Sequence, residues 1–489
     1  MLTTYDKTDP KSIEEFAKQL IGHTFEEVLS WDLSEIRKEY QANYDAKQRK
    51  GGLGNLIEEQ YFGYKANSDS LPDFEEAGVE LKVTPFEKKK DGGLRAGERL
   101  VLSMIDYNGP IEPDFYSSHI WSKCEVLLLI YYWRNKQLPS NLQYEIDYVS
   151  LFTPPAEDLK IIEDDYRIIT EKIAAGKADE LSESDTMYLG ACTKGATKEK
   201  STVPQTYYNP SVKAMKRAFC YKNSYMTYVL NNYLVPSKER DESIVKNADE
   251  LKNKTFEQFI KGKIDEFVGM TDEELCKLFD RPYNNNKSQW VDLAFRMLGI
   301  KSNKAKEFKK AQINVKAIRL EENGTMRENS SLPNIVFKEL VQQEWEDSDL
   351  FNYFNENKFF FVVFRKTGSH YVLKGAQLWN MPYRDLETDV KDGWERVKAT
   401  VLAGVELIPI QRENGVVIKN NLLKQTENRI IHVRPHTSKT YAQLEDGTVY
   451  AKGTIANSDE LPDGRRMTKQ SFWLNNSYVV SQLDDALKQ

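Results

Sequence analysis

Three charged residues, Asp73, Glu80 and Lys82, have the types and spacing needed for phosphodiester chemistry. They lie in the stretch PDFEEAGVELK at 72–82. Glu80 and Lys82 are two positions apart in an apolar segment typical of a strand, so both side chains point to one face. An aspartate at the end of a preceding strand can lie beside them. Two adjacent carboxylates repel each other, and a divalent cation removes that penalty.

Magnesium is the cation that this arrangement favours, because it prefers oxygen ligands and keeps several of its waters. A site of this kind holds the metal between two carboxylates, a phosphate oxygen and a water. The lysine can hold or deprotonate that water and offset negative charge on phosphorus. Such a triplet also occurs in ordinary solvated strands with salt bridges, so the spacing alone leaves that alternative open.

A third acid is expected just upstream of this triplet. The segment NLIEEQYFG at 55–63 predicts a short amphipathic helix that ends at a glycine. Either Glu58 or Glu59 on that helix could face the same metal site.

The surrounding elements alternate between strands and helices, which is typical of an α/β fold. Residues 79–86 and 98–107 read as strands joined by a polar turn at 88–97, and residues 123–133 read as a buried strand. Residues 161–181 have apolar side chains at helical spacing and a glycine near the end.

The bulk composition limits the class of protein. A chain of 489 residues is expected to form two or more domains. Its net charge of -7 is not that of a protein that coats nucleic acid, although a local basic cleft can still bind DNA. The four cysteines and five histidines show no metal-ligand spacing, which argues against a zinc site and for a reducing, cytoplasmic location. No apolar run is long enough to span a membrane, and the first residues lack a signal pattern.

The two halves of the chain resemble each other, which indicates a tandem duplication. Three pairs of segments match in the same order, namely 20–31 with 267–279, 165–176 with 393–404, and 218–230 with 471–483. The charged stretch between 233 and 254, which contains a proline, is the best candidate for a linker. We therefore expect two copies of one α/β domain.

The second copy keeps the frame of the catalytic stretch but not its acids. Residues 73–82 align on EFKKAQINVK at 307–316, which pairs Lys82 with Lys316. The candidate acids are replaced as follows: Asp73 by Glu307, Glu80 by Asn314, and Glu59 by Phe295. Joint alteration of all three positions indicates an inactive second site.

Several blocks of sequence are similar to those of the MutH family. They are ExxFG at 59–63, residues 72–86, 98–107, 117–123, 188–196 and 216–227, and in the second half residues 432–437 and 467–478. The sequence most resembles the duplicated branch of that family, the type II restriction endonucleases that cut at GATC. The resemblance implies two tandem MutH-like domains of the PD-(D/E)xK restriction-endonuclease-like fold, each with a mixed central sheet flanked by helices. A catalytic domain would span 1–235, a linker 236–254, and a degenerate domain 255–489.

The resemblance also implies a magnesium-dependent phosphodiesterase with Asp73, Glu80 and Lys82 at its centre. The family's spacing favours Glu59 over Glu58 as the outer acid, so that Glu59, Asp73 and Glu80 would hold the metal. Lys123 would be a second catalytic lysine near the scissile phosphate. Without the resemblance, Lys123 would read as a strand-edge lysine that prevents aggregation.

A loop before the last helix is implied to read the bases of GATC. In the first copy this loop is residues 192–195, and in the second copy it is residues 434–437. A lysine or arginine there could donate to guanine, the commonest specific base contact. The DNA-binding residues expected on these grounds are Lys194, Gly195, Lys222, Arg434, His436 and Thr437.

The function implied is double-strand cleavage of DNA at 5′-GATC-3′, on the 5′ side of the G, leaving a 5′-phosphate and a four-base 5′ overhang. Cleavage of both strands of a palindrome needs two active sites or two visits by one active site. Two chains would therefore meet on DNA as a transient dimer, or one chain would nick twice. The degenerate copy would bind a second GATC duplex as an effector, or would serve only as a scaffold. No membrane partner is expected.

Three other functions remain open at the level of sequence. One is a methyl-directed mismatch-repair nicking endonuclease, against which the duplication speaks. Another is a non-catalytic GATC-binding protein, and the last is an ordinary α/β protein without this chemistry.

Overall fold

The chain divides into two compact units in the computed structural model, which describes residues 4–31, 52–64, 71–89, 92–195, 201–235, 241–284, 286–413 and 415–489. Unit 1 comprises Met1–Phe259 and Lys304–Gln312, and unit 2 comprises Ile260–Asn303 and Ile313–Gln489. Each unit contains helices and more than one sheet, so the predicted α/β class is confirmed. Within the described ranges, no helix is both long and apolar enough to cross a membrane.

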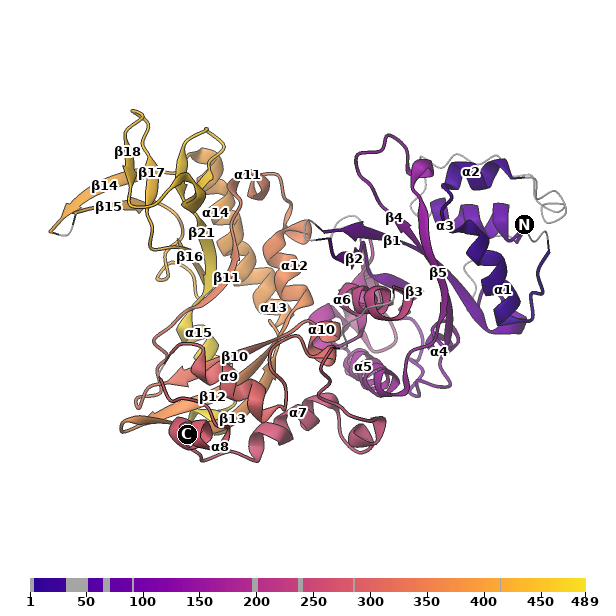
Figure 1. Ribbon diagram of the computed structural model, residues 1–489, viewed down its shortest axis with the longest axis horizontal. Coiled ribbons are helices and arrows are strands. Elements are labelled where there is room, and N and C mark those ends of the chain that lie inside the picture. Colours follow the sequence, from indigo (N-terminus) through magenta and orange to yellow (C-terminus); the bar gives the residue numbers. More distant parts are fainter. Residues whose placement is uncertain are drawn as a thin grey trace. The chain divides into compact units, whose positions relative to one another are not determined.

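The main sheet of unit 1 is mixed. Its strand order is β2 (Leu94–Ala96), β1 (Val79–Lys88), β4 (Val126–Trp133) and β5 (Ile146–Phe152). Strands β1 and β4 are parallel, whereas the other two pairs are antiparallel. Leu128 and Ile130 on β4 pack against α1 (Pro10–Ala17), α2 (Phe25–Ser30) and α3 (Gly52–Leu56), which lie beside this sheet in Figure 1. The alternate residues Leu127 and Leu129 are buried on the opposite face.

A second, antiparallel sheet of unit 1 has the order β3 (Leu100–Met104), β9 (Arg217–Tyr221) and β6 (Leu189–Thr193). The helix α5 (Ala156–Ala174) contacts β6, and α6 (Asn223–Val229) follows β9. The predicted strands at 79–86 and 123–133 and the predicted helix at 161–181 are therefore confirmed in type. The expected strand at 98–107 is present as β3, but it pairs with β9, because the short strand β2 occupies the edge of β1.

Unit 2 repeats both strand patterns. Strand β10 (Ile313–Leu320) runs parallel to β12 (Lys358–Thr367), which pairs antiparallel with β13 (His370–Trp379). A second antiparallel sheet has the order β11 (Ser330–Asn334), β21 (Gln470–Leu474) and β16 (Ile431–Pro435). These orders and directions match those of β1-β4-β5 and β3-β9-β6.

The segments 20–31 and 267–279 also adopt matching structures. Helices α2 and α8 (Asp272–Leu278) both begin at a threonine that forms a capping box, Thr24 and Thr271. The preceding glycines donate their backbone N–H groups to a strand of their own unit, Gly22 to Ile146 O and Gly269 to Leu373 O. The helix α14 (Lys391–Ala403) occupies in the sequence order of unit 2 the position that α5 has in unit 1.

Unit 1 includes one helix whose sequence belongs to the second half of the chain. This helix, α10 (Lys306–Ala311), contacts α6, and Ser224 Oγ on α6 donates to Lys310 O at 2.8 Å. The Lys310 ammonium forms an ion pair of 2.6 Å with Asp158 Oδ1 on α5, and both side chains are buried. Of the expected linker, residues 241–254 are described, and they lie in unit 1.

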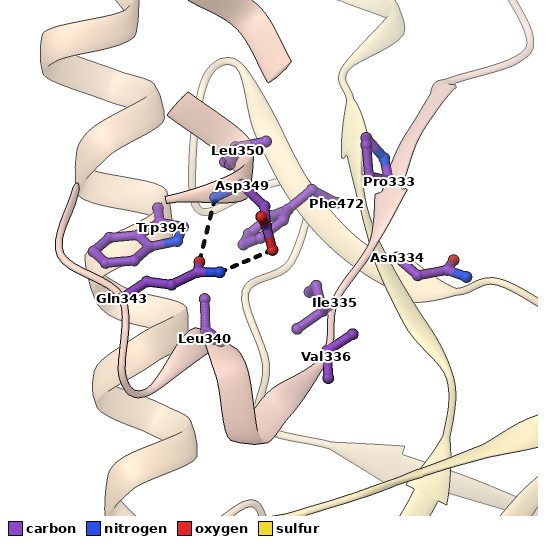
Figure 2. A pocket seen from close by; sticks show the side chains of 10 residues that line it. All are labelled: Pro333, Asn334, Ile335, Val336, Leu340, Gln343, Asp349, Leu350, Trp394 and Phe472. Atoms are coloured by element: carbon purple, nitrogen blue, oxygen red, sulfur yellow. Dashed lines mark hydrogen bonds between the residues drawn. The ribbon is translucent and has the colours of Figure 1, made fainter. Parts of the chain in front are cut away.

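The core of unit 2 contains a small pocket between β11 and the helices around it (Figure 2). Leu340, Trp394 and Phe472 line it, and Gln343 Nε2 donates to Asp349 Oδ2 at 2.8 Å on one side. Its volume of about 20 Å³ suffices for roughly one water molecule. We therefore regard it as a packing feature of this unit.

Candidate functional site

A tight turn brings Asp73 back onto Glu80. Phe74 and Val79 form an isolated bridge, and the residues between them make a short helical turn, Glu75–Ala77. The turn closes at Gly78, whose φ of 64° lies in the left-handed region that favours glycine. The backbone N–H of Asp73 donates to Glu80 Oε2 at 3.2 Å, and the N–H of Leu81 donates to Asp73 Oδ2 at 2.9 Å. Asp73 thus lies beside Glu80 as predicted, although a turn and not a regular strand holds it there.

Two lysines bind the Glu80 carboxylate, which is only 3% exposed. Lys82 Nζ donates to Oε1 at 2.7 Å, and Lys123 Nζ donates to Oε2 at 3.0 Å. Lys123 caps the C-terminus of α4 (His119–Ser122), immediately before β4, and β4 pairs with β1 in parallel. Four of the five expected catalytic residues, Asp73, Glu80, Lys82 and Lys123, therefore form one cluster.

The fifth predicted residue, Glu59, stays a prediction, and the alternative acid on the same turn, Glu58, is one whose charge interacts with this cluster. Burial, followed by the negative charge of Asp73, raises the pKa of Glu58 to about 7, and Lys82 and Glu80 also act on it. The α3 helix continues here as a π-helical turn, Ile57–Tyr61, in which the N–H of Phe62 bonds to Ile57 O. A π-helical turn is closed by a hydrogen bond that spans one residue more than the bond of an α-helix. Spacing based on an ordinary α-helix therefore misplaces the side chain.

The carboxylates of the cluster are crowded. Burial and the neighbouring charge of Glu80 raise the pKa of Asp73 to about 6. Burial, Asp73 and Glu58 together raise the pKa of Tyr64. The Tyr64 hydroxyl is buried and has no hydrogen-bond partner among the described residues. Ionising each of these groups in this buried, negatively charged site costs free energy, and a cation at the site would reduce that cost.

The donor set fits magnesium. In this conformation no three His, Cys, Asp or Glu side chains within the described ranges are close enough to enclose a metal, and two ammonium groups bind Glu80. Magnesium nevertheless needs only one or two carboxylates when substrate phosphate and water supply its other ligands. Glu58, Asp73 and Glu80 offer the hard oxygen donors that it prefers, and their mutual repulsion favours a cation.

A cleft of about 780 Å³ joins this cluster to the expected recognition loop. Lys82 lines it together with Arg99, Cys192 and Lys194. Gly195 follows with a φ of 120°, and a Cβ there would lie only 1.8 Å from Ser201 Oγ. The loop conformation that presents Lys194 to the cleft therefore requires glycine at 195.

Lys222 does not line this cleft. Its predicted role as a DNA-binding residue therefore needs correction. Lys222 is 3% exposed, and its ammonium donates to Thr186 O at 2.7 Å. Burial lowers its pKa, against the opposing effect of Glu183 and Asp165. In this conformation Lys222 is enclosed within unit 1 and cannot reach DNA.

The corresponding loop of unit 2 starts at the end of β16. Arg434 is exposed, and its guanidinium lies 5.3 Å from the centre of the Trp473 ring. His436 Nδ1 lies 3.0 Å from Ser471 Oγ, and Thr437 Oγ1 accepts from the N–H of Lys439 at 3.1 Å. Arg434 and His436 are thus both exposed and Thr437 is half-buried, and of the three Arg434 is the one that lies over an aromatic ring.

The counterpart of this cluster in unit 2 differs from the predicted pairing. The N–H of Val315 donates to Asn303 Oδ1 at 3.2 Å, as Leu81 does to Asp73. Asn303 and not Glu307 therefore occupies the place of Asp73. Glu307 instead accepts hydrogen bonds in unit 1 from Ser243 Oγ and from the N–H groups of Ile244 and Val245.

The comparisons with known proteins fit this site. The family model of the DNA mismatch repair enzyme MutH matches residues 62–165, which include Asp73, Glu80, Lys82 and Lys123. The chain is 35% identical over 466 residues to the type II restriction enzyme Sau3AI of Staphylococcus aureus, covering 90% of this chain and 94% of that enzyme. It is 24% identical over 237 residues to the DNA mismatch repair protein MutH of Actinobacillus pleuropneumoniae serotype 3 (strain JL03), covering 48% of this chain and 97% of that protein. For the MutH protein of Shewanella woodyi (strain ATCC 51908 / MS32), the identity is 30% over 156 residues, 32% of this chain and 65% of that protein.

Proposed function

The chain belongs to the MutH-related type II restriction enzymes, and from that premise we propose that it cleaves both strands of DNA at 5′-GATC-3′ with magnesium as cofactor. Cleavage would occur 5′ of the G and leave a 5′-phosphate with a four-base 5′ overhang. The single observation that carries the proposal is the cluster of Asp73, Glu80, Lys82 and Lys123 beside a cleft that both Lys82 and Lys194 line.

Glu58, Asp73 and Glu80 would hold magnesium, which when bound supplies Lewis acidity toward the phosphodiester and toward water. Lys82 Nζ then holds the attacking water or, in its neutral form, takes a proton from it. Lys123 Nζ keeps Glu80 in orientation through its bond of 3.0 Å to Oε2, and its charge offsets negative charge on the phosphate. Attack in line with the departing 3′ oxygen leaves the phosphate on the 5′ side.

We propose that the chain arose by duplication of one MutH-like domain, with a catalytic domain over 1–235, a linker over 236–254 and a degenerate domain over 255–489. The repeated sheet orders and the matching capping boxes at Thr24 and Thr271 support this origin. A MutH protein that aligns over 97% of its own length covers 48% of this chain, which fits one copy out of two.

The degenerate domain is proposed to bind a second GATC duplex and to stimulate the first. Exposed Arg434, held over Trp473, supports a DNA contact on this domain. In the catalytic domain, Lys194 and Gly195 on the cleft loop are proposed to read the bases. A scaffold role without DNA contact is the competing proposal for the second domain.

A digest of unmethylated plasmid with magnesium tests the proposed function. The wild-type chain and Glu75→Ala, a control at an exposed acid of the same turn, should both yield fragments that end at GATC. Glu80→Gln should lower the cleavage rate by about 100-fold or more, since a metal ligand is lost. Equal cleavage by Glu80→Gln would refute the site. Absence of cleavage by every variant, with GATC-specific gel shift retained, would instead indicate a non-catalytic binding protein.

A further inference from the structure

An arginine that precedes β3, Arg99, lines the same cleft as Lys82 and Lys194. Among the described residues that line this cleft, the charged ones are these three cations and one acid, Glu98. Glu98 lies 4.0 Å from Arg134, which offsets its charge. The cleft is therefore locally basic although the net charge of the chain is -7, and a basic cleft favours the DNA backbone.

A buried carboxylate holds Arg99 at the wall of the cleft. Arg99 Nε lies 2.6 Å from Glu183 Oε2, and Glu183 is only 2% exposed, whereas the Arg99 side chain is 30% exposed. Glu183 begins a short helical turn, Glu183–Asp185, which Ser182 caps. The ion pair therefore anchors one edge of the guanidinium while the arginine remains accessible from the cleft.

Glu183 also has a buried cation beside it, Lys222. A Cβ at Gly190 would lie 3.3 Å from Glu183 Cγ and 3.4 Å from Lys222 Cγ, so both side chains pack against one point of β6. Asp165, a further acid that acts on Lys222, accepts three backbone N–H groups of its own. Two cations thus share the carboxylate of Glu183, which orients Arg99 without cancelling its charge.

We infer that Arg99 binds a backbone phosphate of DNA in the cleft, and that Glu183 is the positioning residue that holds its guanidinium for this contact. The inference rests on the proposed function and adds a contact that fixes the duplex against Lys82 and Lys194. A guanidinium is planar and always charged, so an oriented one can donate two hydrogen bonds to a phosphate. Such a contact sets the position of the duplex and carries no sequence information.

Steady-state cleavage of a short GATC duplex by the full chain in magnesium tests the contact. Arg99→Met should raise KM roughly tenfold and leave kcat unchanged, because a phosphate contact is made equally before and during the reaction. The slope of log kcat/KM against log salt should become shallower by about 1. The ratio of kcat/KM between GATC and a site with one changed base should stay at the wild-type value. Arg99→Lys should restore the salt slope but only part of KM, since it keeps the charge and loses the planar fork.

Glu183→Gln tests the positioning role. Loss of a negative charge near the cleft would by itself strengthen DNA binding, whereas loss of the anchor should raise KM several-fold. In the Arg99→Met background the same change should add little, because its effect passes through the arginine. A lower KM for Glu183→Gln, or a full additional effect in the double variant, would refute the positioning role. Circular dichroism and the melting temperature of each variant show whether the fold is retained.

Arg95→Met is the matched control, because Arg95 also pairs with a glutamate, Glu87 at 2.8 Å, but does not line the cleft. It should leave KM, kcat and the salt slope unchanged. Wild-type KM and salt slope for Arg99→Met would overturn the inference. A loss confined to GATC, with the changed site cleaved as before, would also overturn it, because Arg99 would then read a base. Failure of the proposed function is distinguishable, since the wild type itself would then not cleave GATC.

Discussion

At the turn between Asp73 and Glu80, three carboxylates and two ammonium groups share a partly buried volume, so protons compete with a cation for the same oxygens. The raised pKa values of Asp73, about 6, and Glu58, about 7, show the direction of this competition. Below these values the acids keep protons that an exposed acid would have lost, and a metal must displace them.

The magnesium requirement should therefore depend on pH. The magnesium concentration that gives half-maximal cleavage should fall as the pH rises from about 5.5 to about 7.5, and then level off once both acids are ionised. Initial rates of plasmid cleavage over a magnesium series at each pH measure this. A requirement that stays constant across this range would contradict the assignment of these acids as ligands.

Paired variants separate the two adjacent acids. Glu58→Gln should remove the component near pH 7 and raise the magnesium requirement at all pH values, whereas Glu59→Gln should leave the profile close to that of the wild type. The reverse ranking would restore Glu59 as the outer acid.

Alternation along a strand predicted that Glu80 and Lys82 share a face, with Asp73 beside them, whereas Lys123 was expected only from the resemblance to the MutH family. Sequence spacing could not decide between Glu58 and Glu59, because a π-helical turn has no clear signal in a single sequence. It also paired Asp73 with Glu307, since the match of neighbouring residues outweighed the hydrogen bond to Val315 that identifies Asn303. The burial of Lys222 was equally invisible, because a lysine is rarely enclosed.

At the scale of elements, α10 shows how the two halves of the sequence interleave. It lies between residues of unit 2 in the chain, yet its Lys310 is buried in unit 1 against Asp158 and within about 6 Å of four tyrosine rings, Tyr188, Tyr225, Tyr228 and Tyr233. The charged stretch at 233–254 and the internal repeat predicted a linker and two successive domains, and neither indicated that a later helix completes the first unit.

Loss of the buried charge on α10 should destabilise the protein. Lys310→Met leaves Asp158 uncompensated and should lower the free energy of unfolding by about 3–5 kcal/mol. Urea denaturation followed by circular dichroism measures this change. The double variant Asp158→Asn with Lys310→Met should recover much of the loss, because neither charge then remains buried.

The matched control on the same helix is Lys309→Met, whose ion pair with Asp241 is partly exposed and should contribute below about 1 kcal/mol. Equal effects of Lys309→Met and Lys310→Met would show that the buried pair has no special role. A fragment of residues 1–235 lacks α10 and should be less stable than the same unit in the full chain.

At the scale of the whole molecule, one chain offers one acidic site for a palindrome with two scissile bonds. Two chains that meet on DNA would cut both strands together, so the rate would rise steeply with protein concentration. A single chain that nicks twice would instead accumulate nicked circles. On the proposed function the second unit, with amides at Asn303 and Asn314, would not supply the missing cut in either case, because it lacks the carboxylates that would hold magnesium.

A GATC duplex added in trans should therefore accelerate cleavage of a plasmid that carries one GATC site. If the second unit couples to the first, stimulation of about 5- to 150-fold is expected, the usual range for allosteric coupling. At higher concentration the duplex should also occupy the catalytic cleft, so stimulation should give way to inhibition. A duplex with a scrambled site is the control. An unchanged rate of one-site cleavage at every duplex concentration would leave the second unit as a scaffold.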